Sequence, residues 1–284
     1  MTINWETQIE ADLKDWIGRS ETQSDRIEIA RAQALLRTLG DNRELSEGDV
    51  MPSLFHWLYF WSVKSPNEVG VDGHAKTGGL LPPHPLPRRM WAGGRLNFLA
   101  PIRMGDIVQR CSTITAIKAR NGQSGRLVFI TVKHRYSLGG ECLLEEEQDI
   151  VFLEPATAGV GADRVKADSC PSTTWHSPLD PDEVLLFRYS ALTMNSHRIH
   201  YDSDYAHQQE GYPFLVVHGP LQATMLARLC EQHGRLISRF DFRGQAPAFA
   251  NSMLHFCGEP EEGGARLWAE QNGKPTMMAQ ATWA

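Results

Sequence analysis

The sequence predicts an α+β protein made of two similar halves. A helical pattern occupies 24–41, and a second one occupies 219–233. Each helical part is followed by several strand-like segments of the kind that pair in an antiparallel sheet. The segments LRTLGDN at 36–42 and ALTMNSH at 191–197 occupy comparable places in the two halves, which indicates an internal duplication.

The strands are predicted from runs of β-branched and aromatic residues that are separated by turn residues. An aromatic-rich segment at 53–63 is a further helical candidate, and the Gly- and Pro-rich stretch at 78–94 predicts an irregular connection. The predicted strands occupy 95–102, 106–120, 126–138 and 142–154 in the first half and 236–244, 252–258, 265–271 and 276–284 in the second.

The composition divides the chain into three parts. The first half is expected to span 1–154 and the second half 181–284. The stretch at 155–180 is rich in Pro, Ala, Gly, Ser and Thr and has no periodicity, so it is expected to be a linker with room for one short strand.

The overall composition is that of a globular cytoplasmic protein. Of its residues, 42% are hydrophobic and 22% are charged, and the net charge of −6 argues against nucleic-acid binding. No run approaches the roughly 18 apolar residues of a membrane span, and the acidic N-terminus does not resemble a signal peptide. Five scattered cysteines fit reduced thiols in a cytosol: Cys111, Cys142, Cys170, Cys230 and Cys257.

The candidate chemistry lies in SALTMNSHRIHYDSDYA, residues 190–206, which places Asn195 five residues before His200. His197 stands three residues before His200, but no third ligand follows at a zinc-like spacing, so no metal is expected. Downstream, His218-Gly219-Pro220 opens the helix at 219–233. The N–H groups of a helix start form a ready site for an anion or a developing oxyanion.

These two stretches and LPPHPLPRRMWAGGR at 81–95 resemble the signature of the MaoC-like double-hotdog hydratases and dehydratases. The branch that the chain resembles most contains the mesaconyl-C4-CoA and itaconyl-CoA hydratases and the mitochondrial-type 3-hydroxyacyl-thioester dehydratases. The resemblance implies a double hotdog fold, in which each half is a long helix wrapped by an antiparallel sheet.

The resemblance also implies roles for individual residues. It puts the catalytic Asp of the family at Asn195 and its catalytic His at His200, and it makes Gly219 of the His218-Gly219 pair the amide that holds the oxyanion. Thr224 corresponds to a hydroxyl residue in the following helix turn. Since an amide does not transfer protons near neutral pH, the proton work is expected to fall mainly on His200, while Asn195 holds the water or hydroxyl.

The first half is expected to lack a catalytic pair of its own. Asp41 stands where the second half has Asn195, but the residue five positions later is Ser46 rather than His. One active site per chain is therefore predicted, with the first half covering the acyl or CoA part of the ligand.

The expected function is reversible addition of water to a 2-enoyl-CoA thioester. A short-chain dicarboxylic ester of the itaconyl-, mesaconyl- or citramalyl-CoA type is preferred, with Arg88, Arg89 and Arg198 as candidate anion partners and Trp91 as a candidate pocket residue. Coenzyme A is part of the substrate, so no cofactor is expected, and the partners expected are this substrate and further copies of the chain in a homodimer or larger homo-oligomer.

Two other functions remain open at this level. One is a hotdog thioesterase that uses a nearby carboxylate, Asp202 or Asp204, to activate water. The other is a non-catalytic acyl-CoA-binding protein, which the Asn at position 195 would allow.

Overall fold

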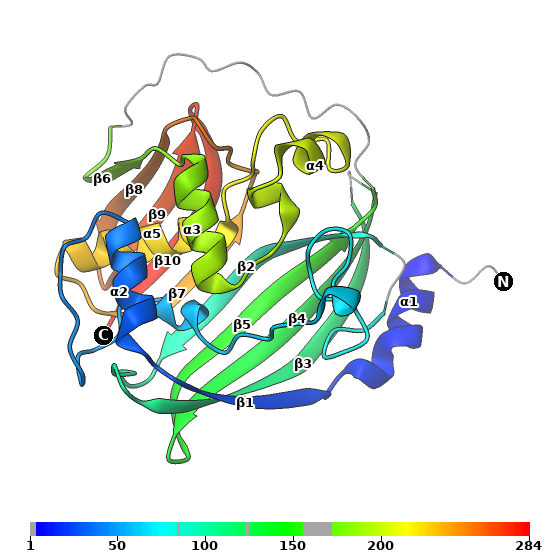
Figure 1. Cartoon of the computed structure of the whole chain (residues 1–284), viewed down its shortest axis with the longest axis horizontal. Coiled ribbons are helices and arrows are strands. Elements are labelled where there is room, and N and C mark those ends of the chain that lie inside the picture. Colours follow the sequence, from blue (N-terminus) through cyan, green and yellow to red (C-terminus); the bar gives the residue numbers. More distant parts are fainter. Residues whose placement is uncertain (1–3, 84–85, 123–124, 156–171) are drawn as a thin grey trace.

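The computed structural model describes residues 4–83, 86–122, 125–155 and 172–284. Their strands form one antiparallel sheet with the order β1-β3-β4-β5-β2-β7-β10-β9-β8-β6 (Figure 1). The first five positions belong to the N-terminal half and the last five to the C-terminal half, so each half repeats the same order outward from the centre. This arrangement is the one expected of a double hotdog.

The observed strands follow most of the predicted segments closely because these segments carry long runs of β-branched and aromatic residues. The N-terminal strands are β1 (Ser20–Arg26), β2 (Arg88–Phe98), β3 (Ile107–Gly122), β4 (Gly125–Leu138) and β5 (Glu141–Leu153). The C-terminal strands are β6 (Trp175–Leu179), β7 (Ile237–Gly244), β8 (Leu254–Glu261), β9 (Gly264–Gln271) and β10 (Lys274–Trp283).

The two halves meet where β2 pairs with β7 over Gly93–Asn97. A Cβ on Gly93 would lie 2.5 Å from the carbonyl oxygen of Phe242, and one on Gly94 would lie 2.7 Å from the Phe242 ring. Glycine is therefore required here for close approach of the strands. The prediction of an irregular connection through 94 is wrong at its end, since β2 already begins at Arg88 and absorbs a register shift between Trp91 and Gly93.

The C-terminal half holds the long central helix, α5 (Gly219–Gln232), whose residues from Leu221 to Cys230 are all buried. It packs against β7, β8, β9 and β10 and begins with Pro220 in its first turn, where the missing N–H costs nothing. Helix α3 (Glu183–Thr193) starts at Asp182, whose side chain caps the N–H of Leu185. The remaining helices are α1 (Trp5–Leu13), α2 (Ile29–Thr38), which lies beside α3, and α4 (Ser203–Gln208).

The expectation of a long helix in each half is wrong for the N-terminal half. Among its described residues the helical candidate at 53–63 forms only the 3₁₀ turn η2 (Phe55–Leu58). Leu54 and Phe60 have φ angles of +67° and +60°, which interrupt any helix on both sides of this turn. Leu54, Phe55, Leu58, Tyr59 and Phe60 are all buried, so the segment lacks the polar face of an amphipathic helix.

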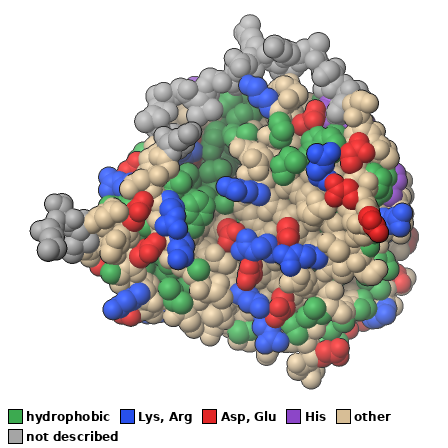
Figure 2. Space-filling model, turned by 180° about the vertical axis from the view of Figure 1, so that it is seen from behind, with side chains coloured by type: hydrophobic (Ala, Val, Ile, Leu, Met, Phe, Trp, Pro, Cys, Tyr) green, Lys and Arg blue, Asp and Glu red, His purple; other side chains and the backbone are tan. Residues whose placement is uncertain are grey.

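The outer surface of the sheet is strongly charged but mixed in sign. Arg95 on β2 pairs across strands with Glu147 and Asp149 on β5, at 2.8 Å and 2.6 Å. Figure 2 shows acidic and basic side chains interspersed over the face opposite to that in Figure 1. Such pairs occupy the solvent side of the strands while alternate residues enter the core.

The range predicted as a linker contains β6, which pairs with β8 at the edge of the sheet. Most of the remaining linker, including Cys170, lies outside the described residues. No helix within the described ranges is long and apolar enough to cross a membrane.

The buried side of α5 provides a test of the packing. Leu226 is fully buried, and truncation of a buried Leu to Ala typically costs about 2–5 kcal/mol. Leu226→Ala is expected to lower the free energy of unfolding by this amount, measured by urea denaturation. Leu236 is 76% exposed, so Leu236→Ala should change the same quantity by less than about 0.5 kcal/mol. Equal effects of the two substitutions would contradict the position assigned to α5.

Candidate active site

A cavity of about 380 Å³ lies between the two halves. Segment 56–64 and strands of the N-terminal half form one side, and Arg89 and Trp91 project from β2. Tyr189, residues 193–196 and Pro220 provide the C-terminal side. The 3₁₀ turn η2 and the irregular chain after it supply most of the residues on the N-terminal side.

Asn195 lines this cavity just beyond the end of α3. Met194 ends the helix in the left-handed conformation, with φ of +51°, which a residue with a side chain adopts less readily than Gly. The Asn195 side-chain oxygen accepts the N–H of His197 at 3.1 Å. Its amide NH₂ group therefore remains as a hydrogen-bond donor for the cavity.

His200 ends the 3₁₀ turn η4 (Arg198–His200) and is 6% exposed. Its Nδ1 donates to the carbonyl of Val216 at 2.7 Å, which leaves Nε2 with a free lone pair. Burial lowers the pKa of His200 to about 4, so the ring is neutral at neutral pH and can accept a proton. His200 is not among the side chains that line the cavity; it is buried behind them.

His218 and Gly219 lie at the start of α5, as predicted. The His218 ring stacks on His200 with centroids 3.6 Å apart, and its Nε2 is 2.8 Å from Oγ of Ser190. His218 is fully buried, and its contact with Ser190 links the start of α5 to α3. A Cβ on Gly219 would meet nothing closer than 3.9 Å, and the neighbouring Pro220 lines the cavity, so the start of α5 borders the cavity. Thr224 is 1% exposed and lies by Tyr189, away from the cavity surface.

The three candidate arginines have different surroundings. Arg88 pairs with Glu210 and donates to the Tyr212 hydroxyl at 2.9 Å. The guanidinium of Arg198 pairs with Asp202 at 2.6 Å. Arg89 lines the cavity and forms no ion pair within 4.0 Å among the residues that the structure describes. Arg89 is therefore the best placed of the three to bind an anion inside the cavity.

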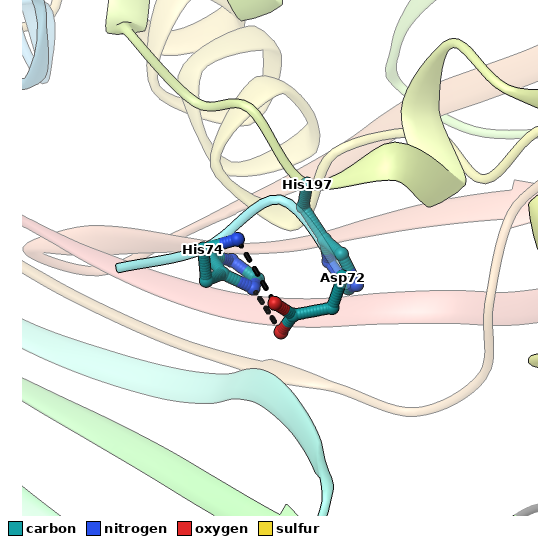
Figure 3. Close-up of side chains that lie close together, drawn as sticks. All are labelled: Asp72, His74 and His197. Atoms are coloured by element: carbon teal, nitrogen blue, oxygen red, sulfur yellow. Dashed lines mark hydrogen bonds and ion pairs between the residues drawn. The ribbon is translucent and has the colours of Figure 1, made fainter. Parts of the chain in front are cut away.

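Asp72, His74 and His197 form a cluster beside the cavity, which His74 lines (Figure 3). The sequence did not predict this cluster. Nδ1 of His74 is 3.0 Å from a carboxylate oxygen of Asp72, and the backbone N–H of His74 donates to the other oxygen at 3.0 Å. The rings of His74 and His197 have centroids 4.2 Å apart. The Asp-Gly-His sequence at 72–74 was the available signal, but nothing in its spacing relates it to residue 197.

The loop at 72–74 reaches the C-terminal half through backbone contacts. The N–H of Arg198 donates to the Asp72 carbonyl at 2.9 Å, and the Ser196 hydroxyl donates to the Gly73 carbonyl. A Cβ on Gly73 would lie 1.9 Å from the carbonyl oxygen of Ser196, and φ of Gly73 is +92°. Only glycine fits both the contact and this backbone conformation.

The charges of the cluster favour a hydrogen-bonded group over a metal centre. Its donor atoms lie within 4.8 Å of one another, and a carboxylate with two imidazoles is a set that could hold a transition metal. However, Asp72 is already bonded to His74, and Arg89 lies close enough to act on the pKa of Asp72, His74 and His197. A permanent cation here opposes the binding of a second one.

The pKa values in the cluster follow from these contacts. Burial raises the pKa of Asp72, but the hydrogen bonds and charge of His74 outweigh this and bring it to about 2. Burial, followed by the charges of His74 and His200, lowers the pKa of His197 to about 2. Burial also lowers the pKa of His74, which Asp72 opposes and Arg89 reinforces.

Comparison with known proteins places this site in a family. The family model for hydroxyacyl-thioester dehydratase type 2 matches residues 54–250. A mesaconyl-C(4)-CoA hydratase of Chloroflexus aurantiacus is 41% identical over 265 residues, which cover 93% of this chain and 94% of that protein. The chain belongs to the hydroxyacyl-thioester dehydratase type 2 family. It is accordingly an enzyme of the hydratase or dehydratase type.

A more distant relative carries the same family description, and solved structures show the fold. The mitochondrial hydroxyacyl-thioester dehydratase type 2 of Schizosaccharomyces pombe is 24% identical over 230 residues, which cover 72% of this chain and 76% of that protein. A MaoC-like dehydratase from Phytophthora capsici matches with a TM-score of 0.71 at 12% identity, over 94% of this chain and 95% of that one. A Mycobacterium tuberculosis protein described as a double hotdog matches with a TM-score of 0.59 at 11% identity, over 94% and 96%. The double hotdog prediction is confirmed.

The match to the hydroxyacyl-thioester dehydratase model spans every side chain that lines the cavity. It includes His74 and Arg89 from the N-terminal half as well as Asn195 and His200. The part of the chain that this family shares is therefore the part that builds the site from both halves.

The buried neutral histidines predict a fall in stability with acid. Burial lowers the pKa of His134 and of His200 to about 4, below the ordinary value of 6.5. The unfolded chain therefore binds protons that the folded chain does not between pH 6.5 and 4, and the free energy of unfolding is expected to decrease over this window as pH falls. Each of the two rings accounts for a decrease of roughly 3 kcal/mol at most in the free energy of unfolding, at 1.36 kcal/mol per pKa unit.

Urea unfolding at pH 7, 6, 5 and 4.5 measures this dependence. His200→Asn should make it shallower, whereas His207→Gln, at an exposed position, should leave it unchanged. A free energy of unfolding that does not fall below pH 6.5 would contradict the neutral, buried state of these rings.

Proposed function

We propose that this enzyme hydrates a short-chain dicarboxylic 2-enoyl-CoA ester of the mesaconyl-, itaconyl- or citramalyl-CoA type. The observation that carries the proposal is the charge of the cavity: Lys64, Arg89 and Arg110 line it, whereas no Asp or Glu does among the described residues. Since the chain as a whole has a net charge of −6, this positive lining is a local feature. It suits a substrate that carries a carboxylate beside the thioester.

The arginine at the centre of this argument is Arg89. Its planar guanidinium can hold a carboxylate through two parallel hydrogen bonds, and it forms no ion pair within 4.0 Å with an acid among the described residues, although the charge of Asp72 acts on it. The 41% identity to a mesaconyl-C(4)-CoA hydratase, whose name denotes the ester of a dicarboxylic acid, supports the same substrate class.

The chemistry follows from the groups at the C-terminal side of the cavity. Nε2 of His200 takes a proton from water as the water oxygen bonds to Cβ of the enoyl group. The NH₂ group of Asn195 holds that oxygen, and the free N–H groups at the start of α5, led by Gly219, stabilise the enolate oxygen that forms from the thioester carbonyl. The reverse sequence eliminates water from a 3-hydroxyacyl ester, and neither direction requires a cofactor besides the CoA of the substrate.

Removal of the His200 imidazole tests the reaction. His200→Ala is expected to lower kcat/KM for hydration by about 10²- to 10⁴-fold, because the group that receives the water proton is lost. The assay follows a panel of enoyl-CoA esters by mass spectrometry, with His207→Ala as the exposed control. Undiminished hydration by His200→Ala would exclude His200 as the base, and release of free thiol from a saturated acyl-CoA would favour a thioesterase instead.

Substitution of Arg89 tests the substrate class. Arg89→Gln removes the charge but keeps much of the side chain, so KM for a dicarboxylic ester should rise by about 10- to 100-fold, since a hydrogen bond to a charged group contributes about 1.5–3 kcal/mol. KM for a monocarboxylic enoyl-CoA should change by less than about threefold. Arg135→Gln on the outer face of β4, where the side chain is 59% exposed, is the matched control. An equal loss for both esters would refute recognition of a substrate carboxylate by Arg89.

A further inference from the structure

The proposed hydration transfers one proton from water and another to Cα of the substrate. The C-terminal half supplies only one group for these two transfers, His200. Water loses a proton when it attacks Cβ, and Cα must gain one. Asn195 occupies the place of the second acid–base group in the family pattern, and its amide does not exchange a proton near neutral pH. A complete site therefore calls for another proton-transfer group at the cavity.

His74 meets this requirement from the N-terminal half. It lines the cavity, which His200 does not. Its Nδ1 is held by Asp72 at 3.0 Å, which leaves Nε2 for a partner outside the pair (Figure 3). A carboxylate behind an imidazole fixes the orientation of the ring and stabilises its protonated form, as in a catalytic triad.

The position of the pair relative to the C-terminal half is fixed by the chain itself. The backbone bond from Arg198 to Asp72 and the close contact of Gly73 with Ser196 hold the loop against the segment that also carries Asn195 and His200. The ring of His197 lies 4.2 Å from that of His74 and 5.6 Å from that of His200, measured between centroids. The two halves thus bring three imidazoles together, and of these His74 lines the cavity.

We propose that His74, oriented by Asp72, is a second catalytic proton-transfer residue that works with His200 in place of the carboxylate that Asn195 lacks. This inference rests on the hydration proposed above. Asp72 is the positioning residue of the pair, because it acts through His74.

The proton balance of the step is simple. Attack of water on Cβ breaks one O–H bond, and that proton goes to Nε2 of His200. The electron pair of the C=C bond moves to Cα and the thioester carbonyl, and Cα then takes a proton from Nε2 of His74. His200 afterwards releases its proton to bulk water and His74 regains one, so the net change is addition of H and OH to the double bond.

The charges around His74 connect this step to the substrate. The groups that act on it are Asp72, which favours the imidazolium, Arg89, which opposes it, and the neutral rings of His197 and His200. A substrate carboxylate bound to Arg89 would cancel the opposing charge. The proton-donating form of His74 would then increase when a dicarboxylic ester occupies the cavity.

The test compares His74→Gln, Asp72→Asn and the control His207→Gln on the ester that the wild-type enzyme hydrates. His74→Gln should lower kcat by about 10²-fold or more with KM changed little, and it should abolish the fall of kcat/KM at high pH. Asp72→Asn should move that fall to lower pH, since the imidazolium loses its carboxylate. His207→Gln should match the wild type. In the double variant His74→Gln/Asn195→Asp the new carboxylate should raise kcat at least tenfold above that of His74→Gln.

The outcomes separate this inference from the function on which it rests. If the wild type hydrates an enoyl-CoA ester and His74→Gln does so at the wild-type rate, the role of His74 is overturned and the hydratase proposal stands. The same conclusion follows if kcat/KM of His74→Gln still falls at high pH as in the wild type. No hydration of any enoyl-CoA ester by the wild type overturns both. Thermal unfolding of each variant identifies any that do not fold, and Asp72→Asn, which keeps the size of the side chain, then decides the question through its pH profile. Loss of activity on dialysis against EDTA that Zn²⁺ restores would also overturn the proposal, because a metal would then occupy the same side chains.

Discussion

The backbone hydrogen bonds between β2 and β7 join two hotdog halves into a single sheet, and the position of every functional side chain depends on this pairing. The strands approach closely because Gly93 and Gly94 face Phe242 without side chains of their own. Arg89 and Trp91 lie on β2 just before this point, and Gly219 lies at the start of the helix that packs on β7. A shift of one residue in the pairing would exchange the two faces of β2 and remove its side chains from the cavity.

The two halves also differ at the ends of α2 and α3. Asp41 follows α2 at the place where Asn195 follows α3, and its carboxylate now pairs with Arg228 of α5 at 3.0 Å. The Arg228 side chain is 5% exposed, so this ion pair is buried and ties the N-terminal half to the central helix. One copy of the duplicated segment thus provides a structural contact, while the other lines the cavity.

Much of the fold could be predicted from the sequence because the strands are long and carry regular runs of β-branched and aromatic residues. The start of β2 was missed because Pro and Gly between 78 and 94 dominate its local pattern, whereas pairing with β5 and β7 decides its conformation. In the EEE run of β5 the alternation of a strand places Glu146 inside, where His56, Trp57, Tyr136 and Gln148 all bond to it. Three identical letters gave no sign that the middle one is buried.

For the candidate site, the sequence predicts Asn195, His200, His218 and Gly219, because they are close along the chain and belong to recognisable motifs. It did not reveal Asp72 and His74, because their relation to His197 arises from a backbone contact between segments more than 120 residues apart. The contact at Gly73 holds polar groups of the two halves around one cavity, so that each half alone carries only some of them. Either half, expressed separately, would therefore hold an incomplete set.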